Sequence, residues 1–319
     1  MTGEQLRAAL DGALAGVDGR ALAAAVQRLT TSYRSSGGAT PPRLDDPVTV
    51  QAYAAYRMPA TYAAVREALT RAPGLLPSTL LDVGGGTGAA AWAAADVLPG
   101  LRQIAVLDRS PVTADLGRRL TAAASHSALR GIRWETTAIG PATVLPPTDL
   151  ITATYLLGEL AEASAHRLVR QIADAARIAV LVEPGTPAGF RRILEARDVL
   201  LAAGFRVMAP CPHDSGCPLR DGADWCHFAV RLERSALHRR VKGGALGYED
   251  EKFCYVVATR DPAAPAGGRI LRHPHKRKGL VEFPVCTAGG TVARTAVGRS
   301  RPDYRAARTA QWGDPWPPG

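Results

Sequence analysis

One short segment constrains the fold of this chain more than any other: LLDVGGGTGAAAW, residues 80–92. An apolar strand pattern runs into a glycine-rich turn and then into an alanine-rich helix. Asp82, Gly84, Gly86 and Gly88 form the pattern D-x-G-x-G-x-G. Glycines permit a tight turn and let the backbone approach a ligand without intervening Cβ atoms. The segment predicts the first strand, ligand-binding turn and first helix of an α/β fold.

The sequence around this segment alternates between strand and helix patterns. We expect strands over 78–85, 102–110, 132–136, 149–157 and 178–185, with helices over 89–98, 113–124, 161–176 and 191–204. Such alternation predicts a parallel, doubly wound sheet with helices on both faces. Three further strand patterns, over 205–210, 225–233 and 252–260, follow without crossover helices. The sheet should therefore end in an antiparallel hairpin.

The ends of the chain have a different character. Residues 1–30 predict two short helices, and a helical stretch from Val50 is expected to break at Pro59 and resume with Thr61 as its cap. The predicted organisation is an N-terminal helical region (1–75), a Rossmann-like domain (76–262) with a Cys-rich insertion (210–227), and a small basic, β-rich extension (263–319). A length of 319 residues suits one large domain with an appendage, or two domains.

The glycine pattern alone fits NAD as well as S-adenosylmethionine. Two features of its context favour S-adenosylmethionine: Asp82 stands where such sites place a carboxylate near the methionine moiety, and the sheet ends antiparallel, as in class I methyltransferases. Asp108 ends the second strand, where it suits the ribose hydroxyls of either cofactor. The fold class predicted is the class I S-adenosylmethionine-dependent methyltransferase, with Asp82, Gly84, Gly86, Gly88 and Asp108 as cofactor-binding residues.

Catalytic residues are not evident. The stretch after the fourth strand, TATYLLGEL, offers only Tyr155 and Glu159, and the Asn/Asp-Pro-Pro-Tyr/Phe clamp for a flipped base is absent. His213 and Glu183 are single residues of a kind that is more often structural. The catalytic residues stay unknown, and methyl transfer stays open.

The five cysteines suggest a metal site. Cys211, Cys217 and Cys226 cluster in a Pro- and Gly-containing segment, and the distant Cys286 can complete a tetrahedral set. Cys254 lies within a strand, where a small buried side chain is expected. Neither zinc nor an iron–sulfur cluster is excluded by the spacing, and three unrelated reduced cysteines are the alternative.

Positive charge is concentrated near the C-terminus. The chain has 39 Lys and Arg against 29 Asp and Glu, and residues 231–319 alone hold 17 basic and 8 acidic side chains. Such one-sided charge suggests a polyanion, most often nucleic acid, although a solvated basic tail is the simpler alternative. Lys276, Arg277 and Lys278 are the predicted RNA contacts.

The sequence has no apolar run long enough for a membrane span and no secretory signal, so we expect a cytoplasmic protein.

Several segments together resemble a known family. RMPATYAAVREAL, LLDVGGGTGAA, PCPHDSGCPL, WCHF and YRAARTAQWGD are similar to the methyltransferase-like assembly factors of the mitochondrial small ribosomal subunit (the Rsm22, or methyltransferase-like 17, family) and their bacterial relatives. The resemblance runs from about residue 50 to 315. PCPHDSGCPL and WCHF are more specific than the glycine turn.

This resemblance implies binding to the small ribosomal subunit through its rRNA. It also implies a four-iron [4Fe–4S] cluster on Cys211, Cys217, Cys226 and Cys286, with zinc as the alternative. The expected function is an S-adenosylmethionine-binding, iron–sulfur protein that supports ribosome assembly or translation, with rRNA methylation left open. Two rivals are a non-catalytic RNA-binding assembly factor that uses the fold as a scaffold, and a small-molecule methyltransferase.

Overall fold

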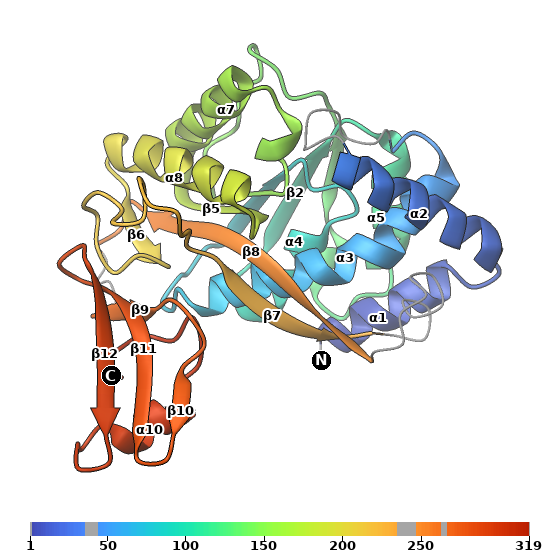
Figure 1. Ribbon diagram of the computed structural model, residues 1–319. Helices are drawn as coiled ribbons and strands as arrows, with labels where there is room; N and C mark the ends of the chain where they lie inside the picture. Colours follow the sequence, from blue (N-terminus) through green and yellow to red (C-terminus); the bar gives the residue numbers. More distant parts are fainter. Residues whose placement is uncertain (1, 36–43, 235–246, 263–266, 319) are drawn as a thin grey trace.

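The computed structural model describes residues 2–35, 44–234, 247–262 and 267–318. Figure 1 shows a large twisted sheet flanked by helices and a smaller sheet formed by the C-terminal residues. Two parts of the basic segment, 235–246 and 263–266, lie outside the described residues, and the second includes residue 263, where the expected extension begins. No helix in the described part of the chain combines the length and apolar character that crossing a membrane requires.

Three helices precede the large sheet: α1 (Thr2–Ala13), α2 (Gly19–Ser35) and α3 (Pro47–Thr70). The expected break at Pro59 and the cap at Thr61 are wrong, because α3 is continuous through both positions. Asp46 is the N-cap and accepts a hydrogen bond from the N–H of Thr49 at 2.9 Å. Met58 and Thr61 are buried on either side of the proline. Burial of the helix against its neighbours outweighs the backbone hydrogen bond that proline removes.

The large sheet has the strand order β3-β2-β1-β4-β5-β8-β6. Its parallel strands are β1 (Thr79–Val83), β2 (Gln103–Asp108), β3 (Arg133–Thr136), β4 (Thr148–Thr154) and β5 (Ala176–Pro184). The long strand β8 (Tyr248–Thr259) runs antiparallel between β5 and β6 (Arg206–Ala209). Its first half also pairs with β7 (Phe228–Glu233). The expected parallel sheet with an antiparallel β7–β8 hairpin is confirmed, and this topology is that of a class I methyltransferase.

Helices bury both faces of this sheet (Figure 1). Leu80 and Leu150 pack with α1, α3 and α4 on one face, and their neighbours Leu81 and Ile151 pack with α7 and α8 on the other. This alternation follows from the two-residue period of a strand. The connecting helices are α4 (Ala89–Val97), α5 (Pro111–Thr121), α6 (Ser127–Arg130), the 3-10 turn η1 (Leu157–Glu159), α7 (Glu162–Ala175) and α8 (Pro187–Ala202).

The C-terminal residues form a second, wholly antiparallel sheet. Its central strand β11 (Leu280–Thr287) pairs with β12 (Val292–Gly298), β10 (His275–Arg277) and β9 (Gly268–Ile270). The helix α10 (Tyr304–Thr309) follows. Ile270, Phe283 and Trp316 belong to a small core that is separate from the cores of the large sheet. The β-rich character expected for this region is therefore present in the folded chain.

Candidate functional site

The turn between β1 and α4 adopts a conformation that suits glycine. Gly84, Gly86 and Gly88 have φ angles of 67°, 55° and 87°, in the left-handed region. A Cβ atom at Gly84 would lie 2.8 Å from the side chain of Leu156, and one at Gly88 would lie 2.9 Å from Trp134. At Gly86 the nearest such atom belongs to Tyr53, at 3.8 Å. Gly84 and Gly88 thus make room for packing, whereas Gly86 presents an open stretch of backbone.

Asp108 lies directly beside this turn. Its carboxylate accepts hydrogen bonds from the N–H groups of Gly86 and Ser110, both at 2.9 Å, and from the hydroxyl of Thr113 at 3.0 Å. Parallel pairing of β1 with β2 places the carboxyl ends of both strands at the same edge of the sheet. The structure therefore brings together Gly86 and Asp108, two of the predicted cofactor-binding residues.

Asp82 lies beneath the turn. Its side chain is fully buried, and Oδ1 accepts a hydrogen bond from the hydroxyl of Thr152 at 2.7 Å. Within the described residues Oδ2 has no hydrogen-bond partner. The pKa of Asp82 is raised to about 7, mainly by burial; the hydrogen bond from Thr152 opposes this rise and the charge of Asp108 adds to it. Asp82 is thus a buried carboxyl group whose negative charge is poorly compensated.

A network that sequence reasoning missed surrounds Tyr155, at the end of β4. Tyr155 has a φ of 55°, which is strained for a residue other than glycine. Its hydroxyl donates to Oε1 of Glu251 at 2.8 Å, and Nη2 of Arg57 lies 3.0 Å from the same oxygen. Tyr155 directly follows β4, Glu251 lies in β8 and Arg57 in α3. Because these residues are far apart in sequence, no local pattern predicts the network. A candidate for catalysis is thus held in an ion-paired cluster.

Glu159 and Glu183, the other carboxyl groups near the end of β4, differ in their surroundings. The pKa of Glu159 is raised to about 7, mainly by burial; the charge of Arg109 opposes this rise and that of Asp108 adds to it. Glu183 is fully buried and accepts the N–H of Leu157 at 2.9 Å, while its other oxygen pairs with Nε of Arg192 at 2.8 Å. Glu183 therefore positions the loop after β4, whereas Glu159 is the less constrained carboxyl group.

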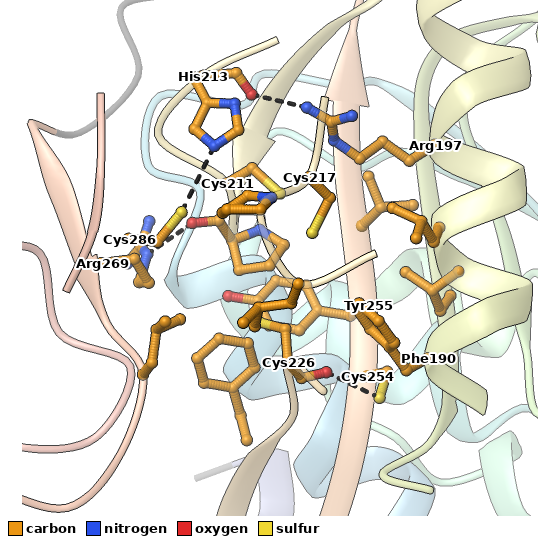
Figure 2. A pocket seen from close by; sticks show the side chains of 18 residues that line it. Phe190, Arg197, Cys211, His213, Cys217, Cys226, Cys254, Tyr255, Arg269 and Cys286 are labelled. Atoms are coloured by element: carbon orange, nitrogen blue, oxygen red, sulfur yellow. Dashed lines mark hydrogen bonds between the residues drawn. The ribbon is translucent and has the colours of Figure 1, made fainter. Parts of the chain in front are cut away.

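All five cysteines line one cavity (Figure 2). Cys211, Cys217 and Cys226 come from the segment between β6 and β7, Cys254 from β8 and Cys286 from β11 of the second sheet. The cavity has a volume of about 40 Å³, more than the roughly 10–15 Å³ that one water molecule needs. The fold therefore gathers thiols from both sheets around a single space.

The thiols in this cavity differ in their partners. Sγ of Cys286 lies 3.4 Å from Nε2 of His213. The thiol of Cys254 donates to the carbonyl of Cys226 at 3.1 Å. The pKa of Cys286 is raised to about 12, mainly by burial and in smaller part by the charges of Cys211 and Cys217. In the described part of the chain, no three His, Cys, Asp or Glu side chains are close enough to bind one metal ion.

The predicted RNA contacts lie away from both sites. Lys276 and Arg277 belong to β10, Lys278 follows them, and all three side chains are exposed. Nη2 of Arg277 lies 3.9 Å from Oε2 of Glu282. The structure shows no ion pair of Lys276 or Lys278 with any residue it describes. This edge of the second sheet therefore presents positive charge to solvent.

Comparison with curated proteins finds relatives in mitochondria. The chain is 30% identical over 287 residues to the human mitochondrial ribosome assembly protein METTL17, covering 82% of this chain and 61% of that protein. It is 24% identical over 289 residues to the Rsm22-cox11 tandem protein 2 of Schizosaccharomyces pombe, covering 75% of this chain and 38% of that protein. The chain thus spans less than two thirds of the length of these relatives.

Solved structures with a similar fold include human N-acetylserotonin methyltransferase, with a TM-score of 0.40 and 17% identity over 74% of this chain and 60% of that chain. Another is magnesium protoporphyrin IX methyltransferase from Synechocystis, with a TM-score of 0.39 and 12% identity over 74% of this chain and 97% of that chain. These scores are low, so the fold assignment rests on the strand order.

The family model described as mitochondrial small ribosomal subunit Rsm22 matches residues 47–317. With both the PCPHDSGCPL segment and the glycine turn inside that match, the chain belongs to the Rsm22 family.

Proposed function

We propose that this protein binds S-adenosylmethionine and a metal centre and assists assembly of the small ribosomal subunit by binding its rRNA. One observation carries the cofactor assignment. The N–H of Gly86 donates a hydrogen bond to the Asp108 carboxylate at 2.9 Å, beside an open stretch of backbone. A backbone turn without side chains and a carboxylate at the end of the second strand are what a nucleoside ligand requires.

The residues of the turn suit this cofactor. Asp108 would bind its ribose hydroxyls and Gly86 would accept it against open backbone, while Gly84 and Gly88 keep the turn in its left-handed conformation. S-adenosylmethionine carries positive charge, which would compensate the buried carboxylate of Asp82, whose Oδ2 has no hydrogen-bond partner in the described part of the chain. When bound, the cofactor supplies a methyl group activated on a sulfonium. NAD lacks a positively charged group of this kind next to an amino-acid moiety, so the buried carboxylate favours S-adenosylmethionine.

The rRNA assignment rests on family membership and on surface charge. The human relative is a ribosome assembly protein, and the family description refers to the small ribosomal subunit. Exposed Lys276, Arg277 and Lys278 lie on one edge of the second sheet, where they can bind phosphate groups of RNA. A small-molecule methyltransferase would give this charged edge no role.

For the metal centre we propose a [4Fe–4S] cluster on Cys211, Cys217, Cys226 and Cys286. Each thiolate of such a cluster binds a different iron atom, so the sulfur atoms lie farther apart than around a single ion. The thiols converge on one cavity, and no three ligand side chains among the described residues are close enough for a single ion, which supports a cluster over zinc. Cys254 is left out because its thiol already donates a hydrogen bond to the carbonyl of Cys226 at 3.1 Å.

Three measurements on the full chain test the proposal. Anaerobic purification with metal analysis and visible spectroscopy should find iron, sulfide and charge-transfer absorption. Calorimetry should detect S-adenosylmethionine binding, and small-subunit rRNA should bind with a strong dependence on salt. Zinc without iron would contradict the cluster, and absence of cofactor binding would leave the fold as an RNA-binding scaffold.

Glu159 favours a second candidate function, methyl transfer to rRNA. With a pKa of about 7 it can take up or release a proton at neutral pH. If the protein is an enzyme, labelled methyl groups should pass to small-subunit RNA, and Glu159→Gln should slow the transfer without changing cofactor affinity. Cofactor binding with no transfer to any subunit precursor would contradict this candidate.

A further inference from the structure

Two buried arginines line the cysteine cavity. Arg197 comes from α8 and Arg269 from β9, and each side chain is only 3% exposed. Figure 2 shows the two side chains on opposite sides of the thiols. Arginine stays protonated in proteins, so the wall of this cavity holds two positive charges.

Backbone carbonyls are the main partners of Arg197. Its Nη2 donates to the carbonyls of His213 at 2.9 Å and Ser215 at 2.7 Å, while Nε is buried without a partner among the described residues. The carboxylate of Asp198 is 3.8 Å from Nη1, but it already pairs with Arg220 at 2.6 Å. Arg197 thus secures the loop between Cys211 and Cys217 and has little negative charge nearby.

Arg269 is placed in a similar way. Its Nε donates to the carbonyl of Pro210 and its Nη1 to the carbonyl of Gly313, both at 2.9 Å. The structure shows no carboxylate paired with Arg269 in the part of the chain that it describes. Carbonyl groups satisfy hydrogen-bond donors but do not neutralise a charge. A buried charge is costly unless an opposite charge accompanies it.

We propose that Arg197 and Arg269 are the buried counter-ions of a dianionic metal centre on Cys211, Cys217, Cys226 and Cys286. This inference rests on the metal centre of the proposed function and deepens it. Four thiolates carry four negative charges, and either a [4Fe–4S] core in its common oxidised state or a zinc ion offsets two of them. The two charges that remain match the two guanidinium groups.

The charge balance also bears on the fourth ligand. His213 lies 3.4 Å from Cys286 and is the obvious competitor. With neutral His213 in place of the Cys286 thiolate, the centre would carry one negative charge and one arginine would lack a counter-charge. Charge balance therefore assigns the fourth position to Cys286 and leaves His213 beside it.

For an iron–sulfur cluster this arrangement has a redox consequence. Reduction adds one electron, so nearby positive charge stabilises the reduced cluster more than the oxidised one and raises the reduction potential. Loss of either guanidinium should shift the potential to more negative values and speed the loss of metal. The two arginines are positioning and charge-balancing residues.

The test compares variants of the anaerobically purified full chain. Arg197→Gln and Arg269→Gln remove the charge, Arg197→Lys and Arg269→Lys keep it, and Arg191→Gln, on the exposed face of the same helix α8, is the matched control. Metal per chain, the rate of metal loss to a chelator and, where iron is present, the midpoint potential are measured. Thermal unfolding identifies which variants are folded.

We expect each Gln variant to lose metal about tenfold faster, as is typical when a residue next to metal ligands is replaced. The potential should also fall, while the Lys variants and Arg191→Gln stay close to the original protein. If the Gln and Lys variants lose metal equally fast, the counter-ion role is wrong. The arginines would then retain the metal only through their hydrogen bonds to the backbone carbonyls. Unchanged Gln variants would overturn the counter-ion role alone. An original protein that binds no metal would overturn the metal centre itself.

Discussion

Sγ of Cys286 lies 3.4 Å from Nε2 of His213, although 73 residues separate them in the chain. Cys286 belongs to β11 of the second sheet, and His213 follows β6 of the large sheet. Nearby, Arg269 of β9 donates to the carbonyl of Pro210 at 2.9 Å. The cysteine cavity is therefore complete only when the two sheets pack against each other. Metal binding should stabilise this packing, and loss of the metal should weaken it.

The cysteine variants should fall into two classes. Ser in place of Cys211, Cys217, Cys226 or Cys286 should remove the metal, because each loses one thiolate ligand. Cys254→Ser should keep the metal and reduce the free energy of unfolding by about 1–3 kcal/mol, the cost of a hydroxyl in a buried strand. Visible absorption and metal analysis of the purified variants measure this.

The same variants test the coupling between metal and docking. Loss of metal in Cys286→Ser should speed proteolysis and amide exchange in residues 267–318 and weaken RNA binding, although the basic residues remain. If Cys254→Ser loses the metal and Cys286→Ser retains it, the fourth ligand is Cys254.

Gly86→Leu should abolish S-adenosylmethionine binding while the protein stays folded. The new side chain would occupy the open stretch of backbone beside Asp108, and the left-handed φ of 55° would cost about 1–2 kcal/mol. Calorimetry measures affinity and thermal unfolding measures stability.

The matched control is Gly74→Leu. Gly74 has a φ of 87° and no atom within 4 Å of a Cβ placed there, and it lies outside the turn. It should show a similar loss of stability with unchanged affinity. Full affinity in Gly86→Leu would place the cofactor elsewhere.

Asp82 should make both stability and cofactor binding depend on pH. Its pKa is raised from 3.8 to about 7 in the folded protein. The unfolded chain therefore releases this proton first, and the stability due to Asp82 is complete below pH 4 and is lost as pH rises to about 7. Asp82→Asn should avoid this loss and raise the free energy of unfolding at pH 8 by on the order of 4 kcal/mol.

Cofactor affinity should show the opposite trend. Because positive charge on the ligand favours the ionised carboxylate, affinity should rise with pH up to about 7 and then level off. Asp82→Asn should bind weakly and lose this part of the pH dependence. Glu159→Gln is the necessary control, since the pKa of Glu159 is also about 7. A pH profile that disappears in Glu159→Gln and persists in Asp82→Asn would assign the dependence to Glu159.

Neutralising Lys276, Arg277 and Lys278 with Gln should weaken binding to all RNA sequences about equally. The logarithm of the binding constant should fall linearly with the logarithm of salt concentration, by roughly 0.7–0.9 for each phosphate contact, and the triple variant should have a shallower slope. Filter binding over a range of salt concentrations measures this.

A triple Gln variant of Arg102, Arg118 and Arg119 is the charge-matched control. These exposed residues lie around β2 and α5, and their replacement changes net charge by the same amount. The control variant should keep the slope of the original protein in the plot of log binding constant against log salt concentration, whereas the Lys276, Arg277 and Lys278 variant should not. An equal decrease of the slope in both variants would mean that net charge alone drives RNA binding.

Much of the fold could be predicted because the relevant signals are local. Strand and helix periods outlined β1 to β5 and their crossovers, and missing crossover helices after Phe205 indicated the antiparallel end of the sheet. The helix α3 was mispredicted because the cost of Pro59 is local and visible in sequence, whereas burial of Met58 and Thr61 against the rest of the protein is not.

The sequence by itself determined the glycine turn, since positive φ at Gly84, Gly86 and Gly88 is a property of single residues. It also determined which cysteines stand near one another in the chain. Tertiary structure alone decided that Arg57 and Glu251 hold Tyr155, and that Arg197 and Arg269 face the thiols. Such contacts join residues tens to hundreds of positions apart, and they depend on burial and charge created only when the elements pack together.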